Sequence, residues 1–250
     1  MKISLVIPCY NEELNIQKGV LDRIGNYTSE RNAFTEVILV DDGSIDNSKE
    51  IVRKKYLKKF PKFVLVENEH QGKAVAVMTG IQKAHGDYVI FTDIDLATPI
   101  DETKNMIAEF EKGNDIVIGT RSTHREGAPL TRKLQSVGFI VLRNLIVGLN
   151  GITDTQCGFK GFKRSVALDV LSRLKVFTSK KHVDGSSVSA GFDLEFLFIA
   201  KKRGYSIDEM PVKWRHAESK NVSLVKDSIE TIRDLVLIRL NDLKGLYSQV

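Results

Sequence analysis

The chain has 250 residues, of which 42% are hydrophobic and 28% charged, and its formal net charge is +5. This length and composition predict one α/β domain of ordinary size with a full core and exclude a disordered chain. The positive charge favours an anionic partner, such as a phosphate ligand or a membrane surface, but a solvated Lys-rich helix flank at 52–60 would explain it as well.

Other features bear on partners and compartment. The single Trp, and basic residues that are not interleaved with aromatic ones, predict no nucleic-acid binding. Cys9 and Cys157 are too few and too far apart for a disulfide framework, so we expect reduced thiols in a cytoplasmic protein. The apolar start at 3–10 is only a strand long, and no apolar run reaches about 18 residues, so we expect neither a signal peptide nor a spanning helix.

Short runs rich in β-branched residues alternate with segments of helical period. The predicted strands are 3–8, 36–41, 62–67, 88–93 and 115–120. They are continuously apolar, which is typical of strands that are covered on both faces. Ile16, Val20 and Ile24 share one face of the first predicted helix, and two further helices are predicted at 72–86 and 99–113. This alternation predicts a mostly parallel sheet with helices on both faces.

Polar residues follow the predicted strands directly. The carboxyl ends of parallel strands share one edge of a sheet, and ligands bind there. These residues are Tyr10, Asn11 and Glu12, then Asp41, Asp42, Ser44 and Asp46, then Asp93 and Asp95, and finally Arg121. We expect them to form one site, in which an acid after the second strand could accept hydrogen bonds from a uracil or a ribose. Asp-Gly-Ser at 42–44 is also an ordinary turn sequence.

Lys73 follows Gly72 at the start of a predicted helix, where anions are favoured. The sequence around it is not a Walker phosphate loop, because Glu67 stands in place of the first glycine and Ala74 in place of Ser or Thr. Lys73 is therefore either a phosphate-binding residue or an exposed lysine on the first helical turn.

Asp93 and Asp95 are two residues apart at the end of the fourth predicted strand, so both side chains can point the same way. Two carboxylates suit Mg²⁺ or Mn²⁺, which usually keep phosphates and waters as their other ligands. The pair therefore predicts a divalent metal held against a diphosphate. A structural role as a turn acid would explain one of the two residues more easily than both.

Four segments together resemble glycosyltransferase family 2, the inverting sugar-nucleotide transferases of GT-A fold. They are VIPCYNEELNI, VILVDDGSIDNS, HQGKAVAVMTGIQKAHGDYVIFTDIDLATP and IVIGTRS, and the resemblance covers about residues 1–220. Segments 154–164 and 191–216 look like those of the polyprenyl-phosphate sugar transferases, with the dolichyl-phosphate β-glucosyltransferase branch nearest. The QxxRW motif of the processive polysaccharide synthases is not found in the sequence.

The resemblance implies an enzyme that moves a hexose from a sugar nucleotide, UDP-glucose in the nearest branch, to a polyprenyl (dolichyl) phosphate. It implies Mg²⁺ or Mn²⁺ as cofactor and a peripheral position at the cytoplasmic face of a membrane. The residues do not distinguish glucose from N-acetylglucosamine or mannose. Transfer to a glycan or another hydroxyl acceptor is the main alternative within the family.

The resemblance also implies roles for individual residues. Nucleotide-sugar binding is expected of Pro8, Tyr10, Glu12, Asp41, Asp42, Lys73, Asp93 and Gln156. A catalytic role, at the diphosphate, the acceptor phosphate or the sugar, is expected of Asp93, Asp95, Arg121, Arg132, Lys133 and Asp154. Asp93 and Asp95 are the expected metal ligands. The segment from Trp214 to His216 would close over the site, where His216 is either a further metal ligand or an ordinary hydrogen-bonding residue.

A phosphate acceptor changes what the chemistry requires. A phosphate monoester has a second pKa of about 6, so it is already largely dianionic at pH 7 and has little need of a general base. The enzyme must instead bring two anions together, which a metal ion and basic side chains can do. Asp193 and Glu195 are candidates for a base or for a structural hydrogen-bond network.

Two later segments bear on the membrane. Segment 134–152 is mostly apolar but contains Arg143 and Asn144, so it is either a helix at a membrane surface or a core helix. Segment 224–247 is amphipathic, and it either docks on the domain, pairs with a second copy in a homodimer, or contacts lipid.

We therefore expect a catalytic GT-A domain at 1–220, divided into a nucleotide-sugar half at 1–120 and an acceptor half at 121–220, and a C-terminal amphipathic helix within 221–250. Two classes outside the family stay as alternatives. One is a non-catalytic sugar-nucleotide-binding module. The other is a haloacid-dehalogenase phosphatase, whose Asp-x-Asp is followed by Gly-Thr where this chain has Leu96-Ala97.

Overall fold

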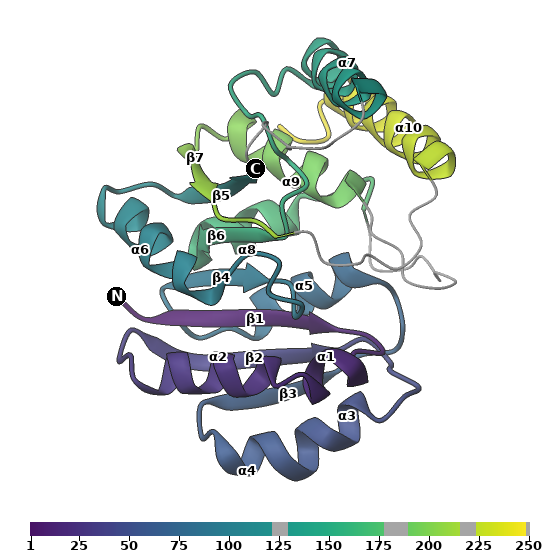
Figure 1. Ribbon diagram of the computed structural model, residues 1–250. Helices are drawn as coiled ribbons and strands as arrows, with labels where there is room; N and C mark the ends of the chain where they lie inside the picture. The colour runs from purple at the N-terminus through teal and green to yellow at the C-terminus, as the bar shows by residue number, and fades with distance from the viewer. Residues whose placement is uncertain (122–129, 178–189, 216–223, 249–250) are drawn as a thin grey trace.

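A computed structural model describes residues 1–121, 130–177, 190–215 and 224–248, with the backbone alone described at 130–137, 190 and 224–228. In this part of the chain seven strands form one sheet in the order β3-β2-β1-β4-β6-β5-β7 (Figure 1). The strands are β1 (Ile3–Cys9), β2 (Phe34–Asp41), β3 (Phe63–Glu67), β4 (Tyr88–Thr92), β5 (Ile116–Arg121), β6 (Phe159–Lys163) and β7 (Ile207–Val212). Only β6 runs antiparallel to its neighbours, β4 and β5, so the predicted mostly parallel sheet is confirmed.

Helices cover both faces of the sheet, as predicted (Figure 1). The helices are α1 (Glu13–Gln17), α2 (Val20–Ser29), α3 (Ser48–Ile51), the π-helical η1 (Val52–Tyr56), α4 (Leu57–Lys59), α5 (Lys73–Lys83), the 3₁₀-helical η2 (Ile100–Glu102), α6 (Thr103–Glu111), α7 (Leu130–Val147), α8 (Arg164–Ser172), α9 (Ala190–Lys202) and α10 (Leu224–Leu243). Alternate residues along β1 face opposite cores. Leu5 packs with α2 and α6, and Val6 packs with α5, α8 and α9.

The five predicted strands all form, each within two residues of its predicted bounds. The helix predicted around Ile16 is broken into α1 and α2 because Gly19 adopts a left-handed conformation with φ of 76°. The helix predicted at 72–86 begins at Lys73, the residue expected on its first turn, and ends at Lys83. The strands β1 to β4 are parallel, so the polar residues that follow them lie at one edge of the sheet. Ligands of a parallel sheet bind at this edge.

The helices α7 and α10 lie side by side at the end of the molecule away from β3, and α10 packs against α9 (Figure 1). Arg143 of α7 is fully buried, and its guanidinium donates to the side-chain oxygen of Asn144 at 2.9 Å and to the carbonyl of Ile152. Burial lowers the pKa of Arg143. The charge that interrupts the apolar segment therefore holds the turn after α7, while Val141 and Leu145 are exposed.

A search of the described helices finds no stretch that is both long enough and apolar enough to cross a bilayer.

Candidate functional site

Asp93 and Asp95 lie in a tight turn directly after β4. The N–H of Leu96 donates to the carbonyl of Asp93 at 3.2 Å, and Leu96 has a φ of 51°. The N–H of Ala97 donates to Asp95 Oδ1 at 2.9 Å. Ile94 between the two acids is buried, whereas both acids are only partly buried. This backbone conformation directs the Ile94 side chain into the core and leaves both carboxylates at the edge of the sheet.

Two neighbours, Lys73 and Gly158, determine the position of the Asp93 carboxylate. Lys73 Nζ, on the first turn of α5, lies 2.5 Å from Asp93 Oδ1. Gly158, just before β6, lies so close that a Cβ built on it would overlap the Asp93 carboxyl group. The role of Gly158 was not predicted, because nothing in its sequence neighbourhood points to Asp93.

The pKa values reflect this crowding. Burial raises the pKa of the Asp95 carboxyl, and the negative charge of Asp93 adds to that rise. Burial opposes the charged form of Lys73, but the Asp93 carboxylate outweighs it and the pKa of Lys73 is raised. Asp93 and Asp95 can carry two negative charges, and Lys73 supplies one positive charge beside them. The site therefore favours the binding of a further cation.

The donor set fits a hard divalent cation, because carboxylate oxygens at a strand end are the ligands that Mg²⁺ and Mn²⁺ prefer. Among the described residues no group of three or more His, Cys, Asp and Glu side chains is placed to hold a metal. Asp93 and Asp95 alone would therefore leave most coordination positions to substrate oxygens and water. His216, the other candidate ligand, lies outside the described residues.

Asp42 and Asp41, at the end of β2, are both 1% exposed but differ in what they bind. The Asp42 carboxylate accepts from the N–H of Gln71 at 3.1 Å, from the N–H of Gly72 at 2.7 Å and from His70 Nδ1 at 2.8 Å. Asp42 therefore holds the loop that leads into α5. One contact that was not predicted, the His70 ring stacked on Tyr10 at 4.0 Å between centroids, joins this loop to β1.

The Asp41 carboxylate is less satisfied. Its Oδ2 accepts from the N–H of Ser44 at 3.1 Å, whereas its Oδ1 is buried and has no hydrogen-bond partner among the described residues. A buried carboxylate oxygen without a partner costs free energy, so it is a candidate acceptor for a ligand N–H or O–H group.

The residues after β1 organise the same edge. Asn11 Oδ1 accepts from the N–H of Ile45 at 2.9 Å, which ties the β1 end to the loop after β2. The Glu12 carboxylate accepts from Asn15 at 2.5 Å, and Pro8 is buried inside β1 opposite Val40. The structure therefore places Glu12 at the edge of the sheet and Pro8 within the strand beneath it.

Arg121 and Asp154 form a bidentate pair at the end of β5. Arg121 Nε lies 2.7 Å from Asp154 Oδ2, and its Nη2 donates to Oδ1 at 2.8 Å. Burial opposes the charge on Asp154, but the Arg121 guanidinium outweighs it and holds the pKa of Asp154 below its usual range. The Trp214 ring lies 5.8 Å from the guanidinium carbon. Asp154 is therefore suited to orient Arg121.

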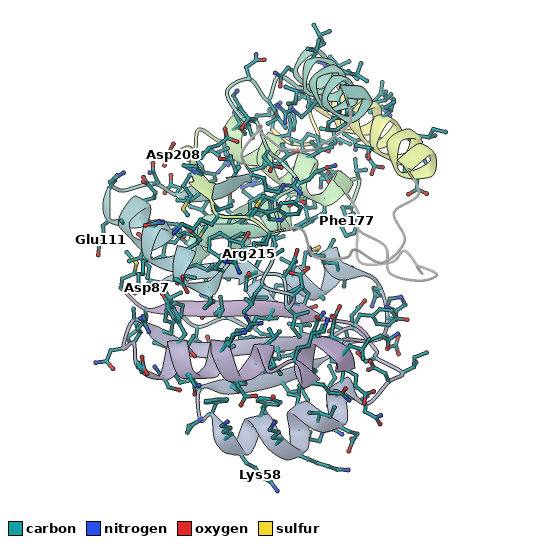
Figure 2. The ribbon with its side chains drawn as sticks, in the orientation of Figure 1. Lys58, Asp87, Glu111, Phe177, Asp208 and Arg215 are labelled. Atoms are coloured by element: carbon teal, nitrogen blue, oxygen red, sulfur yellow. The ribbon has the colours of Figure 1, made fainter. Side chains whose placement is uncertain are left out.

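Three other predicted residues lie near this pair or at the start of α7. Gln156 is exposed, and its N–H donates to Asp154 Oδ1 at 3.2 Å. Arg132 and Lys133 are on the first turn of α7, where their side chains are outside the description. After β7 the N–H of Arg215, which is labelled in Figure 2, donates to the carbonyl of Ala97 at 2.8 Å. This bond brings the end of that strand against the turn that contains Asp93 and Asp95.

Glu195 has a structural role. It is fully buried in α9 and accepts from the N–H groups of Lys175, Val176 and Phe177 at 2.7 to 2.8 Å. It also accepts from the Tyr247 hydroxyl at 2.7 Å. A carboxylate with four donors and no exposure is unsuited to take a proton from a substrate, so the structural alternative holds for Glu195.

Asp193 is paired rather than free. Its Oδ1 lies 2.8 Å from Nζ of Lys160, which is 2% exposed and also donates to the carbonyl of Cys157 at 2.7 Å. The Asp193 charge also contributes to the raised pKa of Lys73, so this second pair acts electrostatically on the Lys73–Asp93 pair. Lys160 was not predicted, because the strand β6 that carries it was not predicted either.

Comparison with known proteins bears on this arrangement. The family model described as glycosyl transferase family 2 matches residues 4–171. The chain therefore belongs to glycosyltransferase family 2, and the predicted resemblance is confirmed.

Curated relatives give a finer likeness. The chain is 34% identical over 253 residues to a dolichyl-phosphate beta-glucosyltransferase of Trichomonas vaginalis, covering 95% of this chain and 73% of the relative. The dolichyl-phosphate beta-glucosyltransferase of Saccharomyces cerevisiae is 30% identical, with 98% and 76% covered. That of Homo sapiens is 32% identical, with 98% and 77% covered.

Solved structures share the fold. Glucosyl-3-phosphoglycerate synthase of Mycobacterium tuberculosis, in complex with Mn²⁺, UDP and phosphoglyceric acid, matches with a TM-score of 0.67 at 19% identity over 95% of this chain and 78% of that chain. Mannosyl-3-phosphoglycerate synthase of Rubrobacter xylanophilus matches with a TM-score of 0.65 at 14% identity, over 100% and 77% of the chains. The α/β fold class is thus confirmed, and the chain is a glycosyltransferase.

Proposed function

We propose that this protein transfers glucose from UDP-glucose to dolichyl phosphate or a similar polyprenyl phosphate, with inversion and with a divalent metal ion. The observation that carries the proposal is the Asp93–Asp95 turn with Lys73 beside it, at the sheet edge where a sugar nucleotide would bind. The relatives at 30% identity or more are named for glucosyl transfer to dolichyl phosphate, which supports the sugar and the acceptor.

Asp93 and Asp95 would hold Mg²⁺ or Mn²⁺, which when bound would neutralise charge on the leaving diphosphate. Lys73 is positioned to contribute a second positive charge at the same place, because it already lies 2.5 Å from Asp93. At the other end of the nucleotide, the buried Asp41 Oδ1 would accept a hydrogen bond from the base or ribose, and Tyr10 would contact the base beside the loop held by Asp42.

The acceptor phosphate would meet Arg121. Asp154 fixes that guanidinium through both of its oxygens, so Arg121 is oriented before the acceptor arrives. Arg132 and Lys133, on the first turn of α7, are proposed to add positive charge to the acceptor side, and Gln156 to contact the sugar. Because the acceptor is a dianion at pH 7, the reaction needs orientation and charge compensation more than a general base.

The arrangement of carboxylates supports a phosphate acceptor over a hydroxyl acceptor. A hydroxyl must lose a proton to a positioned base. Glu195 is buried with four donors, Asp193 is paired with Lys160, and Asp154 is paired with Arg121, so none of these three is free to act as that base.

We further propose that the protein works at the cytoplasmic face of a membrane, where a UDP-sugar would meet a lipid-linked phosphate.

The test is transfer of radiolabelled glucose from UDP-glucose to a short polyprenyl phosphate, with Mn²⁺ or Mg²⁺ and with EDTA. The proposal predicts metal-dependent label in the organic phase, bound through an acid-labile phosphodiester. Label that appears only on a hydroxyl acceptor, or transfer only from another sugar nucleotide, would contradict the proposed acceptor or donor respectively. Nucleotide binding without turnover on any acceptor would favour a binding module.

A further inference from the structure

One side of α10 carries an exposed apolar stripe, here called the α10 stripe. Its members are Ile229, Ile232, Val236, Leu240 and Leu243, whose exposed fractions lie between 41% and 69%. Steps of three and four residues place them on one side of the helix. Leu235 and Ile238, on the other side, are fully buried against the domain. The helix therefore buries one apolar side and leaves a second one in contact with solvent.

Basic residues border the α10 stripe. Arg233 and Lys244 lie along one flank and Arg239 along the other, and all three residues are exposed. Arg239 pairs with Asp242 within the helix, whereas Arg233 and Lys244 form no ion pair with the described residues. The exposed apolar surface thus has positive charge on both sides.

The acids of α10 whose side chains the structure describes, Glu230, Asp234 and Asp242, lie away from the stripe. Asp242 pairs with Lys202 of α9, and Asp234 lies against Gly191 at the start of α9. Glu230 is exposed, but it lies beyond Arg233 around the helix. An apolar centre with basic borders, and with the described acids farther round the helix, is typical of a helix that lies in a membrane interface.

We propose that the α10 stripe is a docking surface for an anionic membrane leaflet. Arg233, Arg239 and Lys244 complement anionic lipid headgroups while the stripe enters the headgroup region. A second copy of the chain is the less suitable occupant, because stripe-to-stripe pairing would bring these basic borders together. Of the described acids of α10, Asp234 and Asp242 lie against the domain and Glu230 lies farther round the helix than Arg233. The exposed Val141 and Leu145 of the neighbouring α7 add apolar surface at the same end of the molecule (Figure 1).

This inference deepens the proposed function and rests on it for its purpose, since a polyprenyl phosphate is held in a membrane. The helix α10 begins nine residues after Arg215, whose N–H is bonded to the metal-site turn. Nine residues span at most about 30 Å. Docking through α10 would therefore keep Arg215, which is bonded to the turn after β4, within that distance of the start of the docked helix.

The experiment is co-sedimentation of the full chain with vesicles of phosphatidylcholine alone and with vesicles that also contain phosphatidylserine. The structure offers a matched pair of variants, Val236→Ser on the stripe and Val64→Ser on β3, because both valines are 43% exposed. We expect binding to the anionic vesicles that Val236→Ser weakens about fivefold and Val64→Ser leaves unchanged. Thermal unfolding of both variants checks that the fold is retained.

A second pair tests the charge. Lys244→Gln removes a border charge, and Lys58→Gln removes an exposed lysine at the opposite end of the molecule (Figure 2). Lys244→Gln should weaken binding about fivefold at low salt, and the difference should shrink at high salt, whereas Lys58→Gln should have no effect.

Equal binding by the members of each pair, or no binding of the wild type to anionic vesicles, would overturn the inference. So would a vesicle-free dimer, detected by analytical ultracentrifugation, that Val236→Ser dissociates, since the stripe would then be covered by a second copy. The proposed function fails separately. Wild-type protein that binds vesicles but transfers no glucose would refute the function alone, and transfer without vesicle binding would refute the docking alone.

Discussion

The Asp93 carboxylate lies between the Lys73 ammonium group and Gly158, and each of these neighbours limits its position in a different way. Lys73 attracts the carboxylate at 2.5 Å, and Gly158 leaves the space that the carboxylate occupies. Replacement of Gly158 by alanine would push Asp93 from this position without removing any charged group. This makes Gly158 a positioning residue for the metal site.

We expect Gly158→Ala to lower the transfer rate by about a hundredfold or more, because displacement of a group at the reacting centre by about 1 Å has that effect. Its apparent metal affinity should fall as well, and a titration with Mn²⁺ measures this. Gly138→Ala in α7 is the control, since a Cβ at that position meets, apart from the backbone of its own helix, no atom of the described residues within 4 Å. A Gly158→Ala enzyme with wild-type rate and metal affinity would show that Asp93 can move without consequence.

The Arg121–Asp154 pair gives a prediction for stability and pH. The pKa of Asp154 is lowered in the folded protein, so its contribution to stability is complete above its unfolded pKa of about 3.9 and is lost as the pH falls through the folded pKa. Asp154→Asn should cost about 2 kcal/mol at pH 7, and this difference should shrink below about pH 4. Urea unfolding of both proteins across that range measures it. A difference that stays constant with pH would mean that the carboxylate charge is not what stabilises the pair.

The sequence allowed the position of Asp93 and Asp95 at the edge of the sheet to be predicted, because the two acids are close together in the chain and end a clear strand. Their role as metal ligands stays a prediction. Gly158 and Lys160 act on the same region from about 65 residues away. Their contacts depend on β6 lying antiparallel beside β4, with Phe91 opposite Lys160. No local pattern encodes that pairing, so neither residue could be assigned a role beforehand.

At the scale of elements, α9 and the turn after α10 meet at one buried carboxylate. Tyr247 is 1% exposed and donates to Glu195, which also binds the three N–H groups of 175–177. Burial raises the pKa of the Tyr247 hydroxyl, and the Glu195 carboxylate adds to that rise. The end of the chain is thus joined to the loop that follows α8.

We expect Tyr247→Phe to reduce the free energy of unfolding by about 1–2 kcal/mol, because the buried Glu195 loses one of its four donors. Tyr27→Phe is the control, since the Tyr27 hydroxyl contacts only the Thr103 hydroxyl, at 3.0 Å, in a partly buried position. Urea unfolding of the two variants compares them. An equal, small loss in both would contradict a special role for the Tyr247–Glu195 bond.

The strands that were not predicted differ in pattern from those that were. The predicted strands β1, β2 and β4 are nearly continuous apolar runs, whereas β6 contains two lysines and a glycine in five residues. The strand β7 lies at the edge of the sheet and alternates buried with exposed residues, including two acids and a proline. The strand β6 was missed because Lys160, whose ion pair with Asp193 is buried, makes it look polar. The strand β7 was missed because an edge strand carries polar residues.

Across the whole molecule, the residues proposed for the nucleotide sugar and those proposed for the acceptor lie on different parts of the sheet. The ends of β1, β2 and β4 and the start of α5 carry Asp41, Asp42, Asp93, Asp95 and Lys73, and the part beyond β4 carries Arg121, Asp154 and the α7–α10 pair (Figure 1). The division into a nucleotide-sugar half and an acceptor half itself stays a prediction. The boundaries at 120 and 220 stay predictions, since α10 packs directly on α9.

The most direct measurement is the glucosyl-transfer rate of Asp95→Asn beside that of Asp101→Asn, an exposed acid six residues further along the chain. Both variants lose one carboxylate charge, but only Asp95 is proposed to hold a metal ion against the diphosphate. We predict a loss of at least about a hundredfold for Asp95→Asn with its fold intact, and a wild-type rate for Asp101→Asn. Full metal-dependent transfer by Asp95→Asn would contradict the account.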